Sequence, residues 1–181
     1  MKYRKQLIHF LFNWTQKKYT RFKKKKPWGI STSNLLDMPK NSFGYRLGDF
    51  LQINNFELLP KVERHDAYHV LCGYSTNVED EIALQYVCFG NGKRSPYLVG
   101  VLLIGTILLP EYLNYYRESF KVGKQANTFH HYDFKTLLHT NFNTLRSSIF
   151  SDKLLTRIKE LQKTNTYNNK TTQLWNRKEV K

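Results

Sequence analysis

The most apolar run in the chain, YLVGVLLIGTILL over residues 97–109, limits the folds that the chain can adopt. Pro110 ends this run, and a helix of that length rises only about 20 Å, whereas the hydrocarbon core of a bilayer is about 30 Å thick. We therefore expect a helix that packs in a protein core and does not span a membrane. Gly100 and Gly105 would allow close approach, either of another helix or of an isoprenoid tail.

Apolar residues recur at helical spacing along the rest of the chain, and no segment shows a convincing alternation with β-branched residues. At 181 residues the chain is long enough for one domain with a sizeable core. The pattern therefore predicts a single all-α domain. The longer helices are expected over residues 42–53, 60–73, 77–89, 97–109, 111–124 and 152–163.

The formal net charge of +15 is concentrated at the two ends of the chain. Residues 1–26 contain ten Lys and Arg and no acid, and residues 151–181 contain eight bases against three acids. This leaves eleven bases and eleven acids for residues 27–150, so the central part is neutral. Basic ends on a neutral body favour an anionic membrane surface as partner, and we expect no nucleic-acid partner.

The composition divides the chain into three parts. Residues 1–26 are expected to form a basic amphipathic helix, which either lies on a membrane or packs on its own domain; a mitochondrial presequence is a further alternative. Residues 27–163 are the helical domain, and residues 164–181 are a polar tail expected to be disordered. The apolar positions of the first helix are Tyr3, Leu7, Phe10, Leu11 and Trp14.

One stretch, RHDAYHVLCGYSTNVEDE over residues 64–81, carries residues that bind metals. His65 and His69 are one helical turn apart, so both imidazoles project from the same face, with Asp66 beside them. The helix is expected to end at Gly73, and a second helix then begins. In an antiparallel hairpin, Glu81 of this second helix can approach the two imidazoles. Two His and one or two carboxylates predict a divalent metal site.

Several residues of this stretch could instead serve a purely structural purpose. Thr76 and Glu79 have the spacing of a capping box, and the acids that start the second helix could simply complement its dipole. Gln85 follows Glu81 by one turn and needs a polar partner. Cys72 could offer a thiolate, but a buried apolar thiol is the preferred interpretation, and the two cysteines indicate a reducing compartment.

The spacing of the site residues resembles the HDxxH(x11)E signature of the coenzyme Q biosynthesis protein 4 family, which acts in ubiquinone biosynthesis. The segment YRESFKVGKQAN over residues 116–127 also looks like the basic segment of that family. The likeness covers roughly residues 27–150, which is the size of a domain. The positions that match the signature are His65, Asp66, His69 and Glu81.

The resemblance implies a metal-dependent decarboxylase of quinone biosynthesis, which removes the C1 carboxyl from a polyprenylated hydroxybenzoate-derived head group in a reaction coupled to oxidation. His65, His69 and Glu81 would bind one divalent ion, Zn or Fe. Asp66 would be a catalytic residue, as a fourth ligand or as an acceptor that orients an imidazole. An apolar channel along residues 97–109 would take the isoprenoid tail.

Two alternatives to this enzyme are a non-catalytic lipid-binding scaffold that organises a quinone-biosynthesis complex and a metal-dependent phosphohydrolase. A zinc protease is disfavoured, because Asp66 would be one methylene shorter than the Glu of HExxH. The expected partners are a prenylated quinone precursor or another isoprenoid lipid, other quinone-biosynthesis proteins and a second copy of the chain in a homodimer. The expected location is the cytoplasmic face of a bacterial plasma membrane, or the matrix face of the mitochondrial inner membrane in a eukaryote.

Overall fold

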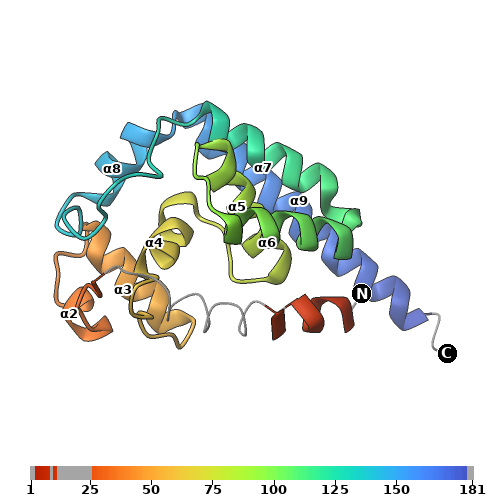
Figure 1. Cartoon of the computed structure of the whole chain (residues 1–181), viewed down its shortest axis with the longest axis horizontal. Helices are drawn as coiled ribbons and strands as arrows, with labels where there is room; N and C mark the ends of the chain where they lie inside the picture. Colours follow the sequence, from red (N-terminus) through yellow and green to blue (C-terminus); the bar gives the residue numbers. More distant parts are fainter. Residues whose placement is uncertain (1–2, 9, 12–25, 179–181) are drawn as a thin grey trace.

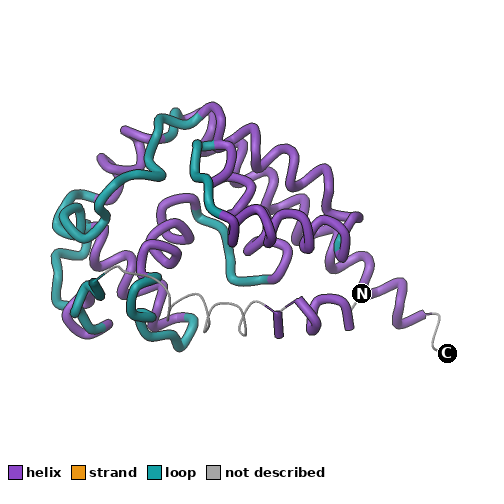
Figure 2. The backbone as a smooth tube through the Cα atoms, in the orientation of Figure 1, coloured by secondary structure: helices purple, strands orange, loops and turns teal. Residues whose placement is uncertain are grey.

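The described residues of the computed structural model, 3–8, 10–11 and 26–178, form helices and loops without a strand, which confirms the all-α prediction (Figures 1 and 2). Residues 3–8 and 10–11 are helical. The later elements are α2 (Thr32–Leu36), α3 (Phe43–Ile53), α4 (Glu63–Cys72), α5 (Val78–Gly90), α6 (Pro96–Leu108), the 3₁₀ turn η1 (Pro110–Tyr112), α7 (Leu113–Gln125), α8 (Phe142–Ile149) and α9 (Asp152–Lys178).

The helix pair α5 and α7 touches through its backbones because each helix supplies a glycine. A Cβ atom on Gly123 of α7 would overlap the carbonyl oxygen of Val87 on α5. A Cβ atom on Gly90 of α5 would likewise overlap the carbonyl oxygen of Phe120 on α7. The two glycines therefore bring α5 into the centre of the domain, where most of its side chains are buried.

Helix α6 packs one face on α5 and exposes the other. Gly105 lies against Ile82 of α5, and its neighbours Leu98 and Leu102 are buried with it. The buried face of α6 confirms the prediction that residues 97–109 form a helix that packs in the protein core. No single helix of the described residues has the length and apolar composition of a membrane span, although α6 and the following segment 110–125, bent by 104° at their junction, meet both criteria as a pair.

The N-terminal helix packs on its own domain. Ile8 is fully buried in the core, and Arg4 forms a two-point ion pair with Glu111 at 2.9 and 3.2 Å. Lys5 forms a second ion pair, at 2.8 Å, with Glu79 at the start of α5. The part of the expected amphipathic helix around Trp14 lies outside the described residues.

The last helix, α9, is longer than the sequence suggests. The expected end was at Lys163, followed by a disordered tail over 164–181, but residues 164–178 continue α9 as a helix. Asn165 is buried and donates a hydrogen bond from its side-chain amide to Asp80 Oδ1 on α5, at 3.2 Å. The contact ties the beginning of this extension, at residue 165, to α5.

Candidate metal centre

Helix α4 carries both histidines and ends in a turn that orients one of them. Gly73 has a φ of 76°, a left-handed conformation that suits glycine, and its N–H donates to the carbonyl of His69 at 2.7 Å. The turn directs the carbonyl oxygen of Tyr74 toward Nδ1 of His69, at 3.1 Å. A carbonyl only accepts, so Nδ1 of His69 carries the proton and Nε2 keeps its lone pair.

Two side chains, His65 of α4 and Glu81 of α5, approach this lone pair. Nε2 of His69 lies 3.2 Å from Nε2 of His65 and 3.2 Å from Oε1 of Glu81. Nε2 of His65 lies 2.9 Å from Oε2 of Glu81. Among the described residues, these three could hold a metal ion together, since their ligand atoms all lie within 4.8 Å of one another. The structure thus brings His65, His69 and Glu81 together as the sequence predicts.

Neighbouring side chains hold the two imidazoles in place. The ring of Phe50 on α3 stacks on His69 with a centroid separation of 5.5 Å and an interplanar angle of 16°. The side-chain amide of Gln85 lies 3.3 Å from Nδ1 of His65. The amide nitrogen of Gln85 donates in this contact, so a neutral His65 directs its Nε2–H at Glu81, and a metal ion on Nε2 would replace that proton. The contact is also the polar partner that a buried glutamine needs.

The centre is closed on one side and open on the other. The side chain of His69 is only 1 % exposed, whereas the side chains of His65 and Glu81 are 26 % and 22 % exposed. A ligand could therefore approach from the side of His65 and Glu81. Three protein ligands with access for a further one are typical of catalytic metal sites, whereas structural zinc sites have four protein ligands.

The two imidazoles stabilise the ionised form of Glu81. Burial acts against ionisation of Glu81, yet the imidazoles of His69 and His65 outweigh it and hold the pKa of this carboxyl well below its ordinary range. Burial alone would lower the pKa of His69, but the Glu81 carboxylate and the Tyr74 carbonyl raise it. Glu81 is thus held as a carboxylate beside the two imidazoles, which is the ionised form that binds a divalent cation.

Asp66 lies beside this group of ligand atoms and is not part of it. Its side chain is half-buried, and burial raises the pKa of its carboxyl to about 6, with the nearby His65 and His69 acting in the opposite direction. The proximity agrees with the expected position on α4. A role for Asp66 as a fourth ligand or as an orienting acceptor stays a prediction.

The three acids that begin α5 have three different partners. Glu79 pairs with Lys5, and Glu81 faces the imidazoles. Asp80 is buried and accepts hydrogen bonds from the Tyr115 hydroxyl at 2.6 Å, from Asn165 and from the Ser75 hydroxyl. Each of the three acids therefore has a specific tertiary partner, in addition to the favourable interaction with the dipole of α5 that the sequence suggests.

The predicted capping box at Thr76 and Glu79 is wrong. The N-cap residue of α5 is Asn77, and its side chain makes no capping hydrogen bond. The Thr76 hydroxyl instead donates to Asn54 Oδ1 at 3.4 Å, and the Glu79 side chain is directed to the ion pair with Lys5. Both side chains bind tertiary partners and therefore do not cap α5.

Cys72 does not contribute to the centre. The thiol is fully buried, and burial raises its pKa well above the ordinary value, so a thiolate is disfavoured. Cys72 is therefore the buried apolar thiol that the sequence favours. The donor set of two imidazole nitrogens and one carboxylate fits a divalent ion of the zinc or iron class.

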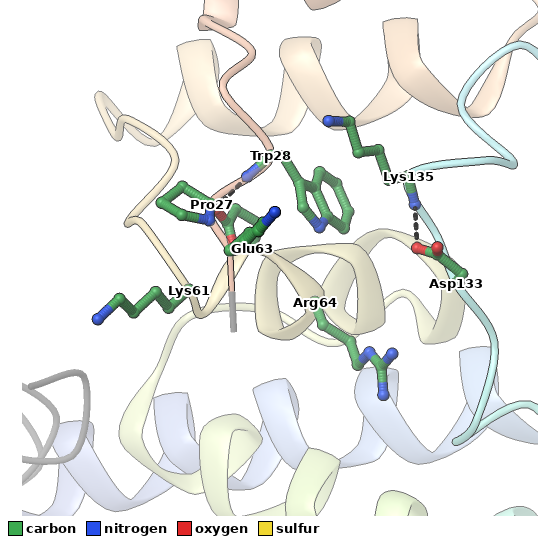
Figure 3. A pocket seen from close by; sticks show the side chains of 8 residues that line it. Pro27, Trp28, Lys61, Glu63, Arg64, Asp133 and Lys135 are labelled. Atoms are coloured by element: carbon green, nitrogen blue, oxygen red, sulfur yellow. Dashed lines mark hydrogen bonds between the residues drawn. The ribbon is translucent and has the colours of Figure 1, made fainter. Parts of the chain in front are cut away.

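A cavity of about 330 Å³ lies beside the start of α4 (Figure 3). Its lining is mainly polar and charged, with Trp28 as the aromatic wall and the Trp28 backbone N–H donating to Glu63 at 2.9 Å. No residue of 97–109 contributes to this cavity, so the apolar channel stays a prediction. The lining residues are Lys26, Pro27, Trp28, Lys61, Glu63, Arg64, Asp133 and Lys135.

The fold is similar to that of a solved protein. A crystal structure at 2.85 Å resolution, of a protein from Nostoc punctiforme PCC 73102 assigned provisionally to ubiquinone biosynthesis, superimposes with a TM-score of 0.59. The likeness covers 82 % of this chain and 82 % of that chain at 18 % sequence identity, so it shows the fold alone. Among curated proteins, none shows significant similarity to the chain.

A family model gives a more specific assignment. Residues 59–153 match the model described as Coenzyme Q (ubiquinone) biosynthesis protein Coq4, and this region is more than half of the chain. It contains α4 and α5 entire, with all four residues of the HDxxH(x11)E spacing and the turn that orients His69. The chain therefore belongs to the coenzyme Q (ubiquinone) biosynthesis protein Coq4 family, and its role lies in coenzyme Q biosynthesis.

Proposed function

We propose that the chain is a metal-dependent enzyme that removes the C1 carboxyl group as CO₂ from a polyprenylated hydroxybenzoate-derived head group. The accompanying oxidation of the ring would pass its electrons to an external oxidant, such as molecular oxygen. The observation that carries this proposal is the convergence of His65, His69 and Glu81 on one point that is accessible from one side. The Coq4 match supports the pathway, and the donor set supports an ion that keeps room for a substrate.

Each residue of the centre has its own task in this reaction. Nε2 of His65, Nε2 of His69 and the carboxylate of Glu81 would hold the ion, while the Tyr74 carbonyl and Gln85 fix the two rings. When bound, the ion would act as a Lewis acid on a carboxylate or phenolate oxygen of the head group and stabilise the charge that develops as the carbon–carbon bond breaks.

The fixed rings would contribute by limiting reorganisation during the reaction. His69 is immobilised between Phe50 and the turn at Gly73, so its lone pair points to the centre before any ligand arrives. His65 and Glu81 are more exposed and border the side where a head group would enter. Donors that are preorganised in this way reduce the cost of reaching the charged transition state.

The test combines metal content with turnover. Purified wild-type protein is expected to contain or take up about one zinc or iron ion per chain and to release CO₂ from a prenylated head-group acid. The variant His65→Ala/Glu81→Ala should lose both properties and keep its helical circular-dichroism spectrum. The control His139→Ala removes an exposed histidine outside the centre and should behave like the wild type.

Turnover that survives in the double variant would refute the proposal. Metal binding without any turnover in the wild type, with oxidant and prenylated substrate supplied, would favour the non-catalytic scaffold, in which the ion is structural.

A further inference from the structure

The end of α4 presents backbone carbonyl oxygens that need donors from outside the helix. The last carbonyls of an α-helix have no intrahelical donor, and a buried carbonyl without a donor costs free energy. In α4 the helical pattern stops at Gly73, whose N–H binds the carbonyl of His69. The carbonyls of Leu71 and of Gly73 itself accept hydrogen bonds from side chains of later helices.

The donors come from the two C-terminal helices. Arg146 of α8 donates from Nε to the carbonyl of Leu71 at 3.0 Å, and the two residues are 75 positions apart in the sequence. Gln162 of α9 donates from its side-chain amide to the carbonyl of Gly73, which lies 89 positions earlier. The end of α4 is therefore held by residues that are distant in the sequence.

The guanidinium of Arg146 also packs directly on the turn. A Cβ atom on Gly73 would lie 3.0 Å from Nη2 of Arg146. The ring of Phe142, one turn earlier on α8, supports the same guanidinium, with 5.8 Å between Cζ and the ring centroid. The positive charge is also favourable near the C-terminal end of α4, which is the negative end of its dipole. Arg146 is therefore fixed between Phe142 and the turn.

Helix α9 is anchored to the core on both sides of Gln162. Leu154 and Ile158 are buried in the core, and Ile158 precedes Gln162 by one turn. Asn165, which follows Gln162 by three residues, is also buried and binds Asp80 of α5. The bond from Gln162 to the turn therefore connects the end of α4 to the part of the domain that contains α5, the helix of the carboxylate ligand.

The conformation of this turn decides how His69 is oriented. Residues 73–77 are not helical, so their conformation depends on contacts with the rest of the domain. The carbonyl of Tyr74, which accepts the Nδ1–H of His69, comes directly after the carbonyl that Gln162 binds. A turn without its two side-chain donors could rotate this carbonyl away, and Nε2 of His69 would then no longer be aimed at the centre.

We propose that Arg146 and Gln162 are positioning residues of the metal centre, which act on His69 through the turn at Gly73 and the carbonyl of Tyr74. Neither is one of the three ligand residues. Gln162 also lies beyond residue 153, where the match to the family model ends, so the centre of this chain depends on a residue outside the matched region. The proposal rests on the metal centre of the proposed function and not on the reaction.

The test removes the two donors and keeps side chains of similar length. In Arg146→Met/Gln162→Met we expect the affinity for Zn²⁺, measured by competition with a chromogenic chelator, to fall by about tenfold. Loss of the positive charge of Arg146 would by itself favour a cation, so a lower affinity reports the geometry of the site. The visible absorption spectrum of bound Co²⁺, which responds to ligand geometry, should change as well. Gln162→Met alone alters one partly exposed side chain and should lower the affinity by a smaller factor, which keeps the test available if the double variant does not fold.

Asn165→Leu is the matched control. It removes an amide donor of the same helix, at a more buried position, but the partner of this donor is Asp80 and not the turn. The Zn²⁺ affinity and the Co²⁺ spectrum of this variant should therefore stay close to those of the wild type, although the protein is less stable. Circular dichroism should show the same helical spectrum for all the variants.

The proposal is overturned if either methionine variant binds Zn²⁺ and Co²⁺ as the wild type does. An equal fall in affinity for Asn165→Leu would also overturn it, because the effect would then come from a general loosening of α9. A wild type that binds no Zn²⁺ would overturn both this proposal and the proposed function. A wild type that binds the ion without turnover, together with the expected loss of affinity in the variants, would refute the proposed reaction and leave the positioning role supported.

Discussion

The α4–α5 hairpin and the α5–α7 pair share one helix but are held together in opposite ways. The hairpin is joined by polar side chains, with His65 and His69 facing Glu81 across the gap. The α5–α7 pair is held by direct backbone contact at Gly90 and Gly123, which have no side chains to keep the two helices apart. The comparison shows that α5 is fixed rigidly on one side, so that a precise polar site can be built on the other.

The largest expected effect is on the glycine contact. Gly123→Val would force side-chain atoms into the Val87 carbonyl, so the helices must separate, and we expect a loss of about 3 kcal/mol in the free energy of unfolding. Urea denaturation followed by circular dichroism measures it. Gly100→Ala is the matched control, because a Cβ there meets nothing within 4 Å, and it should stabilise by about 0.5–1 kcal/mol. Equal effects of the two changes would mean that α5 and α7 are not in backbone contact.

A smaller effect should distinguish two adjacent acids of α5. Asp80→Ala leaves the donors on Ser75, Tyr115 and Asn165 without their acceptor, and we expect a loss of about 1–3 kcal/mol with metal binding retained. Unfolding curves and metal titration of the same samples provide the measurement.

Glu81→Gln should act on metal binding instead. It removes the anionic ligand from the centre, so we expect metal affinity to fall by about a hundredfold. The metal-free protein should also lose, near pH 7, the stabilisation that the two imidazoles give the Glu81 carboxylate. A competition titration with a chromogenic chelator reads this affinity. The contrast fails if Asp80→Ala loses the metal as completely as Glu81→Gln does.

The smallest expected effect concerns Asp66 and pH. Burial raises its pKa to about 6 in the folded state, so the folded protein binds this proton more tightly than the unfolded chain does. Its contribution to stability is therefore present at low pH and is lost as the pH rises through about 6. In metal-free protein, Asp66→Asn should add about 1 kcal/mol near pH 7, and the gain should vanish near pH 4. Thermal unfolding of both proteins between pH 4 and pH 7, with a chelator present, measures this gain. A gain that does not change with pH would mean that Asp66 is well solvated.

The convergence of the three candidate ligands could be predicted from the sequence because its geometry is mostly local. His65 and His69 are brought together by the helical period alone, and Glu81 is close enough in the sequence for one hairpin to deliver it. Phe50 and the Tyr74 carbonyl were not predicted, because an aromatic residue at core spacing and a backbone carbonyl carry no sequence signal for a metal site.

The tertiary contacts of the neighbouring acids could not be predicted in the same way. Asp80 bonds to Tyr115 and Asn165, which are 35 and 85 residues away, and no periodicity connects such positions. The same contact ties residue 165, just beyond the expected end of the last helix at Lys163, to α5. Gly90 and Gly123 look unfavourable for a helix in isolation, and only the packed pair shows why they are there.

The hydrogen bond from His69 to the Tyr74 carbonyl has a consequence for how the centre tolerates mutation. The acceptor belongs to the peptide backbone, so a change of the side chain at position 74 leaves it in place. The turn at Gly73 therefore sets which ring nitrogen of His69 carries the proton. Few residues other than glycine adopt the φ of 76° at this position without strain. The backbone contact that orients His69 therefore depends on this glycine and not on the identity of the side chain at position 74.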